Sequence, residues 1–239
     1  MLSVFFEKVE YQDLNGVAYE RIKQKFIDNE FLPGDKLDVA QLSVSLGVSR
    51  TPVVNALKKL AEDGFVTIRP RSASYVREHT REEIEYIFDF REVMECLVVH
   101  KIIGRLDIAQ LSTLRDRLVE LKNKGIPNRD VLNEYLDTEM KLHEYMLRLC
   151  PPIVSGKLEN LVELTKRLRK LHLQYLLEVK GVVGLADTEI QIHIDVANAL
   201  LAGNAEAAER YVRKDIRDTR NEILEDYEAI EIFSRESPH

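Results

Sequence analysis

Residues 33–69, PGDKLDVAQLSVSLGVSRTPVVNALKKLAEDGFVTIR, constrain the fold more than any other part of the chain. Asp38 can cap a short helix, and Gly47 permits a sharp turn after it. Ser49 can cap a second helix, and Gly64 marks its end before the strand-like run FVTI. The order of these signals predicts a helix-turn-helix followed by a wing. This arrangement places one helix in the major groove of DNA.

The second predicted helix has one apolar face and one polar face. Apolar residues at helical spacing form a stripe that we expect to be buried, namely Val53, Ala56, Leu57 and Leu60. Arg, Thr and Asn near the start of such a helix can meet base edges, and a later Lys can meet phosphate. A solvated charged face is the alternative, but the caps, turn and strand in order favour DNA contact. The candidate contacts on this face are Arg50, Thr51, Val54, Asn55 and Lys58.

The charge of the chain is unevenly distributed. The net charge is −7, which argues against a nonspecific coat on nucleic acid. Residues 47–77 nevertheless contain six basic residues against two acidic ones, Glu62 and Asp63. The basic set includes Arg69 and Arg71 in the predicted wing, which join the candidate DNA contacts. A local charge of +4 on an acidic protein is typical of a focused DNA footprint.

The remainder of the chain follows a helical pattern. Thr80 and Glu83 form a capping box that opens a long helix. We predict six helical segments at about 80–105, 107–124, 129–149, 153–179, 186–202 and 205–229, separated by Gly and Pro breaks. The expected fold is therefore mainly α, with a winged helix-turn-helix domain at 1–78 and an all-α antiparallel helical bundle at 79–239.

The sequence also indicates where the protein acts. We find no secretory leader and no apolar run long enough to span a membrane, so we expect a cytoplasmic protein without a membrane partner. Cys96 and Cys150 lie in helical patterns and do not form a zinc motif, which favours reduced, buried thiols.

Ionisable residues lie on the apolar stripes of three bundle helices. They are Glu139, His143, His193 and Asp215. Burying an unpaired carboxylate is unfavourable, so such residues are usually paired or hold a metal. Two imidazoles and two carboxylates suit a divalent transition ion, although hydrogen-bonded core residues are the alternative. Asp137 and Glu189 are rival ligands, and we expect Arg167 and Arg169 on the surface of a long charged helix.

The N-terminal motifs closely resemble those of GntR-type bacterial transcription regulators. PGDKL, LGVSRTPV and AL..L...G.V carry the resemblance over residues 14–77. It implies that Ser49, Arg50 and Thr51 face DNA. This chain has Val54 and Asn55 where the family usually has Arg-Glu, and it lacks the family's usual wing glycine. The operator sequence therefore cannot be transferred from relatives, and we expect Val54 to contact a thymine methyl.

The bundle resembles the FCD domain of the FadR-type branch of that family. FREVMEC at 90–96, EMKLH at 139–143 and HIDVANALLAGNAEAAERYVRKDI at 193–216 carry the resemblance. It implies a metal on Glu139, His143, His193 and Asp215, with Glu replacing the usual Asp and Asp215 replacing a His. These replacements shift preference from Zn or Ni toward Mn. The resemblance also implies that Arg91 clamps an effector carboxylate, the alternative being a salt bridge to Glu95 or Asp89.

These observations predict a homodimeric transcription regulator, by default a repressor. Its helical domain would sense a small carboxylic acid through the metal and shift the protein between two DNA-binding states. Alternatives are a metal-free regulator that binds its effector directly, a metal-dependent hydrolase, and a dimerisation module that senses nothing. We expect no enzyme activity, because no separate general base is evident and a hydrolase leaves the winged domain unexplained.

Overall fold

The computed structural model describes residues 13–70, 73–125, 128–180 and 186–236. The chain divides into two compact units. The first comprises Met1–Phe26 and Gly34–Arg77, and the second comprises Ile27–Pro33 and Glu78–His239. Within the described ranges, no helix is both long and apolar enough to cross a membrane.

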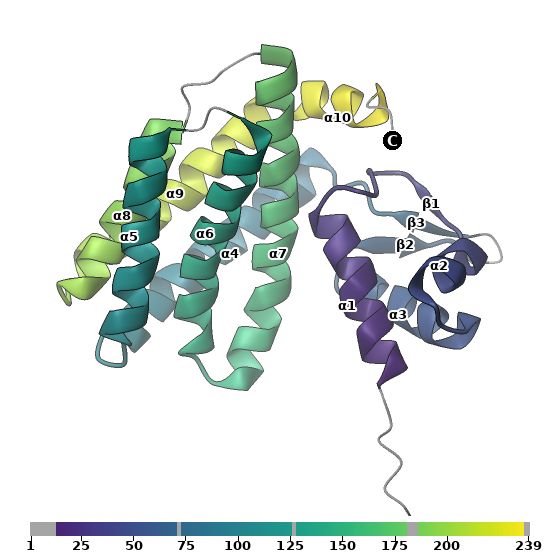
Figure 1. Ribbon diagram of the computed structural model, residues 1–239, viewed down its shortest axis with the longest axis horizontal. Coiled ribbons are helices and arrows are strands. Elements are labelled where there is room, and N and C mark those ends of the chain that lie inside the picture. The colour runs from purple at the N-terminus through teal and green to yellow at the C-terminus, as the bar shows by residue number, and fades with distance from the viewer. Residues whose placement is uncertain (1–12, 71–72, 126–127, 181–185, 237–239) are drawn as a thin grey trace, which may run out of the picture. The chain divides into compact units, whose positions relative to one another are not determined.

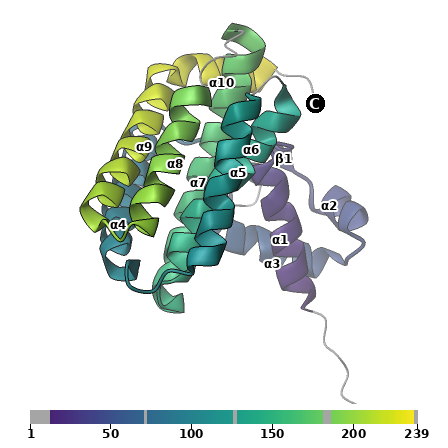
Figure 2. The same cartoon turned by 60° about the vertical axis from the view of Figure 1, so that its left-hand side comes forward.

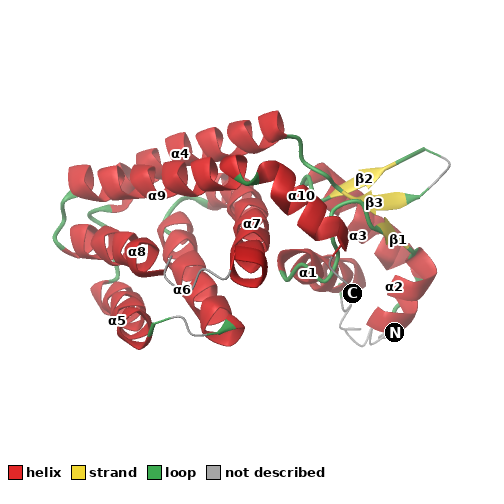
Figure 3. Ribbon diagram, turned by 90° about the horizontal axis from the view of Figure 1, so that it is seen from above, coloured by secondary structure: helices red, strands yellow, loops and turns green. Residues whose placement is uncertain are grey.

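The first unit is a small helical domain with a three-stranded sheet (Figure 3). Its elements are α1 (Leu14–Ile27), β1 (Lys36–Leu37), α2 (Val39–Leu46), α3 (Arg50–Glu62), β2 (Val66–Ile68) and β3 (Ser74–Val76). The sheet is antiparallel in the order β1-β3-β2, so β3 pairs with both neighbours. This is a winged helix-turn-helix, with β2 and β3 as the wing.

Most of the predicted helix caps and turn residues are present. The Asp38 carboxylate accepts hydrogen bonds from two backbone N–H groups at the start of α2, and Gly47 ends that helix at φ 68°. This left-handed conformation suits a residue without a Cβ atom. The prediction for Ser49 was only half right: it occupies the N-cap position of α3, but its side chain makes no capping hydrogen bond.

The second unit is an all-helical bundle (Figures 1 and 2). Its helices are α4 (Arg81–Ile102), α5 (Ile108–Lys124), α6 (Arg129–Arg148), α7 (Pro152–Tyr175), α8 (Ala186–Leu201), α9 (Ala205–Glu225) and α10 (Tyr227–Glu236). Helix α9 packs along α4 and α8, α5 packs along α8, and α6 packs along α7. Thr80 and Glu83 form the predicted capping box at the start of α4.

Two details of the bundle differ from the prediction. Helix α7 continues through a π-helical turn at Leu176–Lys180. The last predicted segment, 205–229, is two helices: α9 ends at Glu225 with Asp226 as its C-cap, and α10 follows and packs on α7. The Asp226 carboxylate lies 3.1 Å from His172 Nε2 of α7. This tertiary contact accompanies the break, and the local pattern of the sequence does not reveal it.

The segment 27–33 belongs to the helical unit although the chain places it between two parts of the winged unit. Lys170 of α7 forms an ion pair with Asp28 at 2.9 Å. Arg167 of α7 donates to the carbonyl of Phe31 at 3.3 Å. Arg167 is therefore buried, and the prediction that it lies on the surface was wrong.

Candidate functional site

Helix α3 separates its apolar and polar faces as the spacing predicts. Val53, Ala56, Leu57 and Leu60 are at most 2% exposed and pack into the core of the winged unit. The candidate DNA-contacting residues of this region are all exposed: Ser49, Arg50, Thr51, Val54, Asn55 and Lys58. Pro52 lies in the first turn and is buried, where its missing N–H group has no helical partner to lose.

Two of the candidate DNA contacts, Asn55 and Arg69, interact with other side chains of the winged unit. Asn55 donates a hydrogen bond to the side chain of Asn15 at 3.2 Å, which orients its amide. The guanidinium of Arg69, in the wing, stacks over the Tyr75 ring at 4.4 Å from the ring centroid. Such stacking positions a cation at a modest energetic gain. The other wing candidate, Arg71, lies outside the described residues.

Three of the four predicted metal ligands meet inside the bundle. His143 of α6, His193 of α8 and Asp215 of α9 are each at most 7% exposed. One ligand atom from each lies within 4.8 Å of the others. His143 Nε2 is 3.5 Å from Asp215 Oδ2, and His193 Nε2 is 3.3 Å from Asp215 Oδ1. Three helices far apart in the sequence thus converge on one point.

A buried ion pair contacts the Nδ1 side of the His143 ring, opposite Asp215. His143 Nδ1 lies 2.6 Å from Glu95 Oε2 of α4, and the other oxygen of Glu95 accepts from Arg91 Nε at 2.5 Å. Arg91 also donates to Thr165 Oγ1 of α7 at 2.8 Å. Because Nδ1 faces a carboxylate, its proton lies there and Nε2 is directed at Asp215. This is the geometry by which outer carboxylates orient ligating histidines.

His193 is oriented in the same sense by the backbone. Its Nδ1 lies 2.9 Å from the carbonyl oxygen of Glu189, which can only accept a hydrogen bond. A proton on Nδ1 satisfies this carbonyl, and in that neutral tautomer Nε2 carries the lone pair. That Nε2 is buried and makes no hydrogen bond within the described residues, although it lies 3.3 Å from Asp215 Oδ1. An orphaned imidazole nitrogen beside a carboxylate fits a metal ion.

The charges of this cluster are strongly coupled. Burial alone raises the pKa of Glu95, but Arg91 and His143 outweigh burial and lower it to about 2. Burial lowers the pKa of His143, yet the Glu95 carboxylate more than compensates and raises it to about 9. Burial also opposes ionisation of Asp215, but the two histidines hold its pKa well below the ordinary value. With His143 protonated the charges of the cluster pair with one another, so a metal ion that binds here must displace the proton on His143 Nε2.

Glu139, the fourth predicted ligand, is engaged by an arginine. Its Oε1 lies 2.9 Å from Arg169 Nε, whereas its Oε2 is 3.8 Å from His193 Nε2. Arg169 also binds Glu189 at 3.0 Å and donates to Thr219 Oγ1 at 2.6 Å. Arg169 is 5% exposed, so the prediction of a surface position was wrong. Two buried carboxylates and a hydroxyl supply the partners that a buried guanidinium requires.

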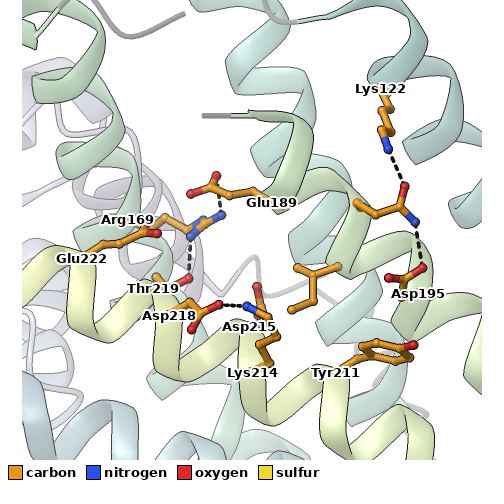
Figure 4. A pocket seen from close by; sticks show the side chains of 12 residues that line it. Lys122, Arg169, Glu189, Asp195, Tyr211, Lys214, Asp215, Asp218, Thr219 and Glu222 are labelled. Carbon is orange, nitrogen blue, oxygen red and sulfur yellow. Dashed lines mark hydrogen bonds and ion pairs between the residues drawn. The ribbon is translucent and has the colours of Figure 1, made fainter. Parts of the chain in front are cut away.

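A pocket of about 620 Å³ adjoins the cluster (Figure 4). Its charged residues include Lys122, Arg169, Glu189, Asp195, Lys214, Asp215, Asp218 and Glu222. Tyr211, Gln191, Ile192 and Thr219 complete the lining. Asp215 belongs to both the cluster and the pocket, so a small molecule there can reach the cluster. Arg91, predicted to clamp an effector, does not line this pocket and instead holds Glu95 and Thr165.

Sequence reasoning identified His143, His193 and Asp215 by their spacing but missed the supporting residues. Glu95 was considered only as a partner of Arg91, and Arg169 was assigned to the surface. One signal was available for Glu95: it shares the buried face of α4 with Phe88 and Arg91 at intervals of three and four. Arg169 had a comparable signal, because it follows Leu158, Val162 and Thr165 at intervals of four, three and four. Its partners come from α6, α8 and α9, and no local pattern indicates them.

The first unit has the fold of a DNA-binding winged helix-turn-helix, and the second has a buried polar cluster beside a pocket. Together they define a DNA-binding transcription regulator. Residues 14–76 match the family model for bacterial regulatory proteins of the gntR family, and residues 86–218 match that of the FCD domain. The chain belongs to the GntR family and carries an FCD domain. It is a transcription regulator and not an enzyme, which removes the hydrolase alternative.

Comparisons with individual proteins agree with this family assignment. The chain is 27% identical over 194 residues to the HTH-type transcriptional regulator YdhC of Bacillus subtilis, covering 81% of this chain and 84% of YdhC. It is 22% identical over 213 residues to the transcriptional repressor RspR of Escherichia coli, covering 89% and 90%. The solved structure of E. coli McbR/YncC matches with a TM-score of 0.74 at 22% identity, over 90% of this chain and 98% of McbR. That structural likeness supports the fold alone.

Proposed function

We propose that this regulator is a repressor whose helical unit senses a small carboxylic acid through a divalent metal. The observation that carries the proposal is the convergence of His143, His193 and Asp215 beside the pocket. Repression is the default sign of such regulators, and the relative RspR is named as a repressor. Since operator DNA is its target, we place the protein in the cytoplasm.

We assign His143 Nε2, His193 Nε2 and a carboxylate oxygen of Asp215 as ligands. A three-residue set leaves coordination positions for water or a ligand. Two nitrogens and one oxygen suit Zn, Ni or Mn, and the carboxylate favours the harder ions among them. Glu139 stays a predicted fourth ligand, and it can join only by leaving Arg169. The bound ion would supply a Lewis-acidic centre, while Glu95 and the Glu189 carbonyl hold the two rings in register.

We assign the DNA contacts to the exposed face of α3 and to the wing. Ser49, Arg50, Thr51, Val54 and Asn55 would read base edges, and Lys58 and Arg69 would meet phosphate. The exposure of these residues supports the assignment, because the opposite face of α3 is buried. Arg71 stays a predicted phosphate contact outside the described residues.

We propose further that two copies pair through α4. Tyr86, Phe90, Val93 and Leu97 form an apolar stripe on this helix, and each is at least 51% exposed. The stripe is flanked by acidic residues near the start of α4 and by Lys101 near its end. Antiparallel pairing of two α4 helices would join the stripes and oppose these charges. Two winged units could then read the half-sites of an inverted repeat.

Elemental analysis of purified protein, with DNA binding measured across a panel of small carboxylic acids, tests the sensing proposal. We expect about one divalent ion per chain and release of double-stranded promoter DNA by at least one acid. His143→Ala combined with His193→Ala should remove the ion and the response while leaving DNA binding in place. Unchanged metal content and response in this variant would show that the sensing site lies elsewhere.

A metal-free regulator is the second candidate, and one observation favours it. With His143 protonated, the row Arg91, Glu95, His143 and Asp215 alternates in charge without any ion. In that case the protein as purified would contain no stoichiometric metal, and a chelator would leave effector binding unchanged. Direct binding of the acid to the pocket would then account for sensing.

A further inference from the structure

The pocket beside the cluster contains more carboxylates than cations. Among the described residues, five carboxylates line it against three cations. The acids are Glu189, Asp195, Asp215, Asp218 and Glu222, and the cations are Lys122, Arg169 and Lys214. A ligand whose charged groups are all carboxylates would be expected to need unpaired cations along the pocket as well as the ion. The distribution of charge here points to a different class of ligand.

Each cation of the pocket is already engaged by a residue of the protein. Arg169 pairs with Glu139 and Glu189. Lys214 pairs with Asp218 one turn along α9. Lys122 donates to the amide oxygen of Gln191 at 2.5 Å. A ligand carboxylate would therefore have to displace a partner in order to gain any of these cations.

The acidic end of the pocket has acceptor capacity that the protein leaves unused. Glu189 Oε1 is buried and makes no hydrogen bond within the described residues. Glu222 lines the same end, and Figure 4 shows both carboxylates around Arg169. One guanidinium thus faces Glu139, Glu189 and Glu222.

A second metal ion is a poor explanation for this acidic end. Among the described residues, the single group with metal-ligating geometry is His143, His193 and Asp215. An ammonium group fits better, because it brings one positive charge and three hydrogen-bond donors. A hydroxyl group donates only one hydrogen bond and leaves the excess negative charge in place.

We propose that the pocket binds a ligand with a protonated amine as well as a carboxylate, an amino acid or a small derivative of one. The amine lies against Glu189 and Glu222, and the carboxylate would meet the ion that we assign to His143, His193 and Asp215. This inference rests on the proposed function, since it takes the pocket as the effector site and names the chemistry of the effector.

Matched pairs of ligands test the inference on the full-length protein. Each pair shares a carbon skeleton and differs only in an amine or hydroxyl group, for example aspartate with malate, alanine with lactate, and glutamate with 2-hydroxyglutarate. Calorimetry should show at least one amino acid binding ten-fold or more tightly than its hydroxy acid, a difference of about 1.4 kcal/mol. Equal or tighter binding of the hydroxy acid in every pair, or no binding by any amino acid, overturns the inference.

Side-chain variants show whether the acidic end causes the preference. Glu222→Gln should reduce the amine preference of the best pair at least five-fold, with little change for its hydroxy acid. Glu206→Gln removes an exposed charge from the same helix, away from the pocket, and should leave the preference unchanged. Should Glu222→Gln fail to fold by circular dichroism, Glu189→Gln serves the same purpose. An unaltered preference in a folded pocket variant counts against the inference.

Different results would contradict the sensing function and the amine assignment. If acids without an amine bind the pocket and release DNA, the sensing function stands and the amine assignment falls. If no acid of either kind changes DNA binding, while the protein still binds promoter DNA, the sensing function itself falls.

Discussion

Glu95 Oε2 lies 2.6 Å from His143 Nδ1 in the core of the helical unit. The contact joins α4 to α6 and directs the other ring nitrogen at Asp215. Arg91 fixes the second oxygen of Glu95, so the row from guanidinium to imidazole is buried throughout. The orientation of the candidate metal ligand is thus set by residues outside the ligand set.

Replacement of Glu95 should weaken metal binding. Glu95→Gln keeps the shape of the side chain but removes the charge that orients and polarises His143. We expect a loss of about 10–100-fold in metal affinity, the usual range for such supporting residues. Competition with a chromogenic chelator measures the change, and Glu82→Gln, exposed on the same helix, is the control. Equal affinities in the two variants would remove Glu95 from this role.

Replacement of Arg169 should destabilise the fold. Arg169→Met leaves the carboxylates of Glu139 and Glu189 buried without their cation. Removing one partner of a buried ion pair costs about 3–5 kcal/mol of unfolding free energy. Urea denaturation checks this, with the exposed Arg148→Met as a control expected to lose less than about 1 kcal/mol. Adding Glu189→Gln should recover part of the loss, and equal losses in the two arginine variants would contradict the assignment.

The stability of chelator-treated protein should depend on pH through His143 and Glu95. The pKa of His143 is raised from 6.5 to about 9, so its stabilisation is complete below pH 6.5 and is lost as pH rises through 9. The pKa of Glu95 is lowered from 4.5 to about 2, so its contribution is present above pH 4.5 and is lost toward pH 2. Denaturation midpoints should therefore be highest between about pH 4.5 and 6.5 and decline on both sides. His143→Ala should flatten the decline at alkaline pH, and an identical profile in that variant would refute the cause.

A charge on the apolar stripe of α4 should separate the dimer. Phe90→Glu places a carboxylate at the centre of the proposed contact, where burial would leave it unpaired. Sedimentation velocity should show a monomer for this variant at concentrations where the unmodified protein is a dimer. Ile153→Glu changes an equally apolar, 83% exposed residue on α7 and should not alter the mass. A dimer that survives Phe90→Glu would place the interface elsewhere.

A change at Val54 should alter which base is read. Val54→Arg replaces an apolar contact with a side chain that binds guanine in the major groove, and one good contact discriminates bases by about 1–3 kcal/mol. Selection from a randomised promoter library should therefore show a new preference at one position per half-site. Lys58→Ala is the comparison, because loss of a phosphate contact weakens all sequences alike and lowers the salt dependence. An unchanged preference would remove Val54 from the reading set.

The winged unit was predictable because its signals are local. Caps, turn glycines and the period of apolar residues act within a few positions, so Asp38, Gly47 and the stripe from Val53 to Leu60 could be read directly. The exception was Ser49, whose side-chain rotamer is not determined by its position in the sequence. The break between α9 and α10 was also missed, since the C-cap Asp226 pairs with His172 on another helix.

The sequence by itself determined the inward faces of α6, α8 and α9, because helical period decides which residues share a face, although Arg167 and Arg169 of α7 were wrongly assigned to the surface. It therefore indicated His143, His193 and Asp215 as inward-facing residues. Only the tertiary structure decided how those faces meet: Arg169 engages Glu139, Arg91 holds Glu95 rather than lining the pocket, and the pocket carries excess negative charge. Pairing between buried charges depends on the distances between helices, and a periodic pattern along one helix contains no information about them.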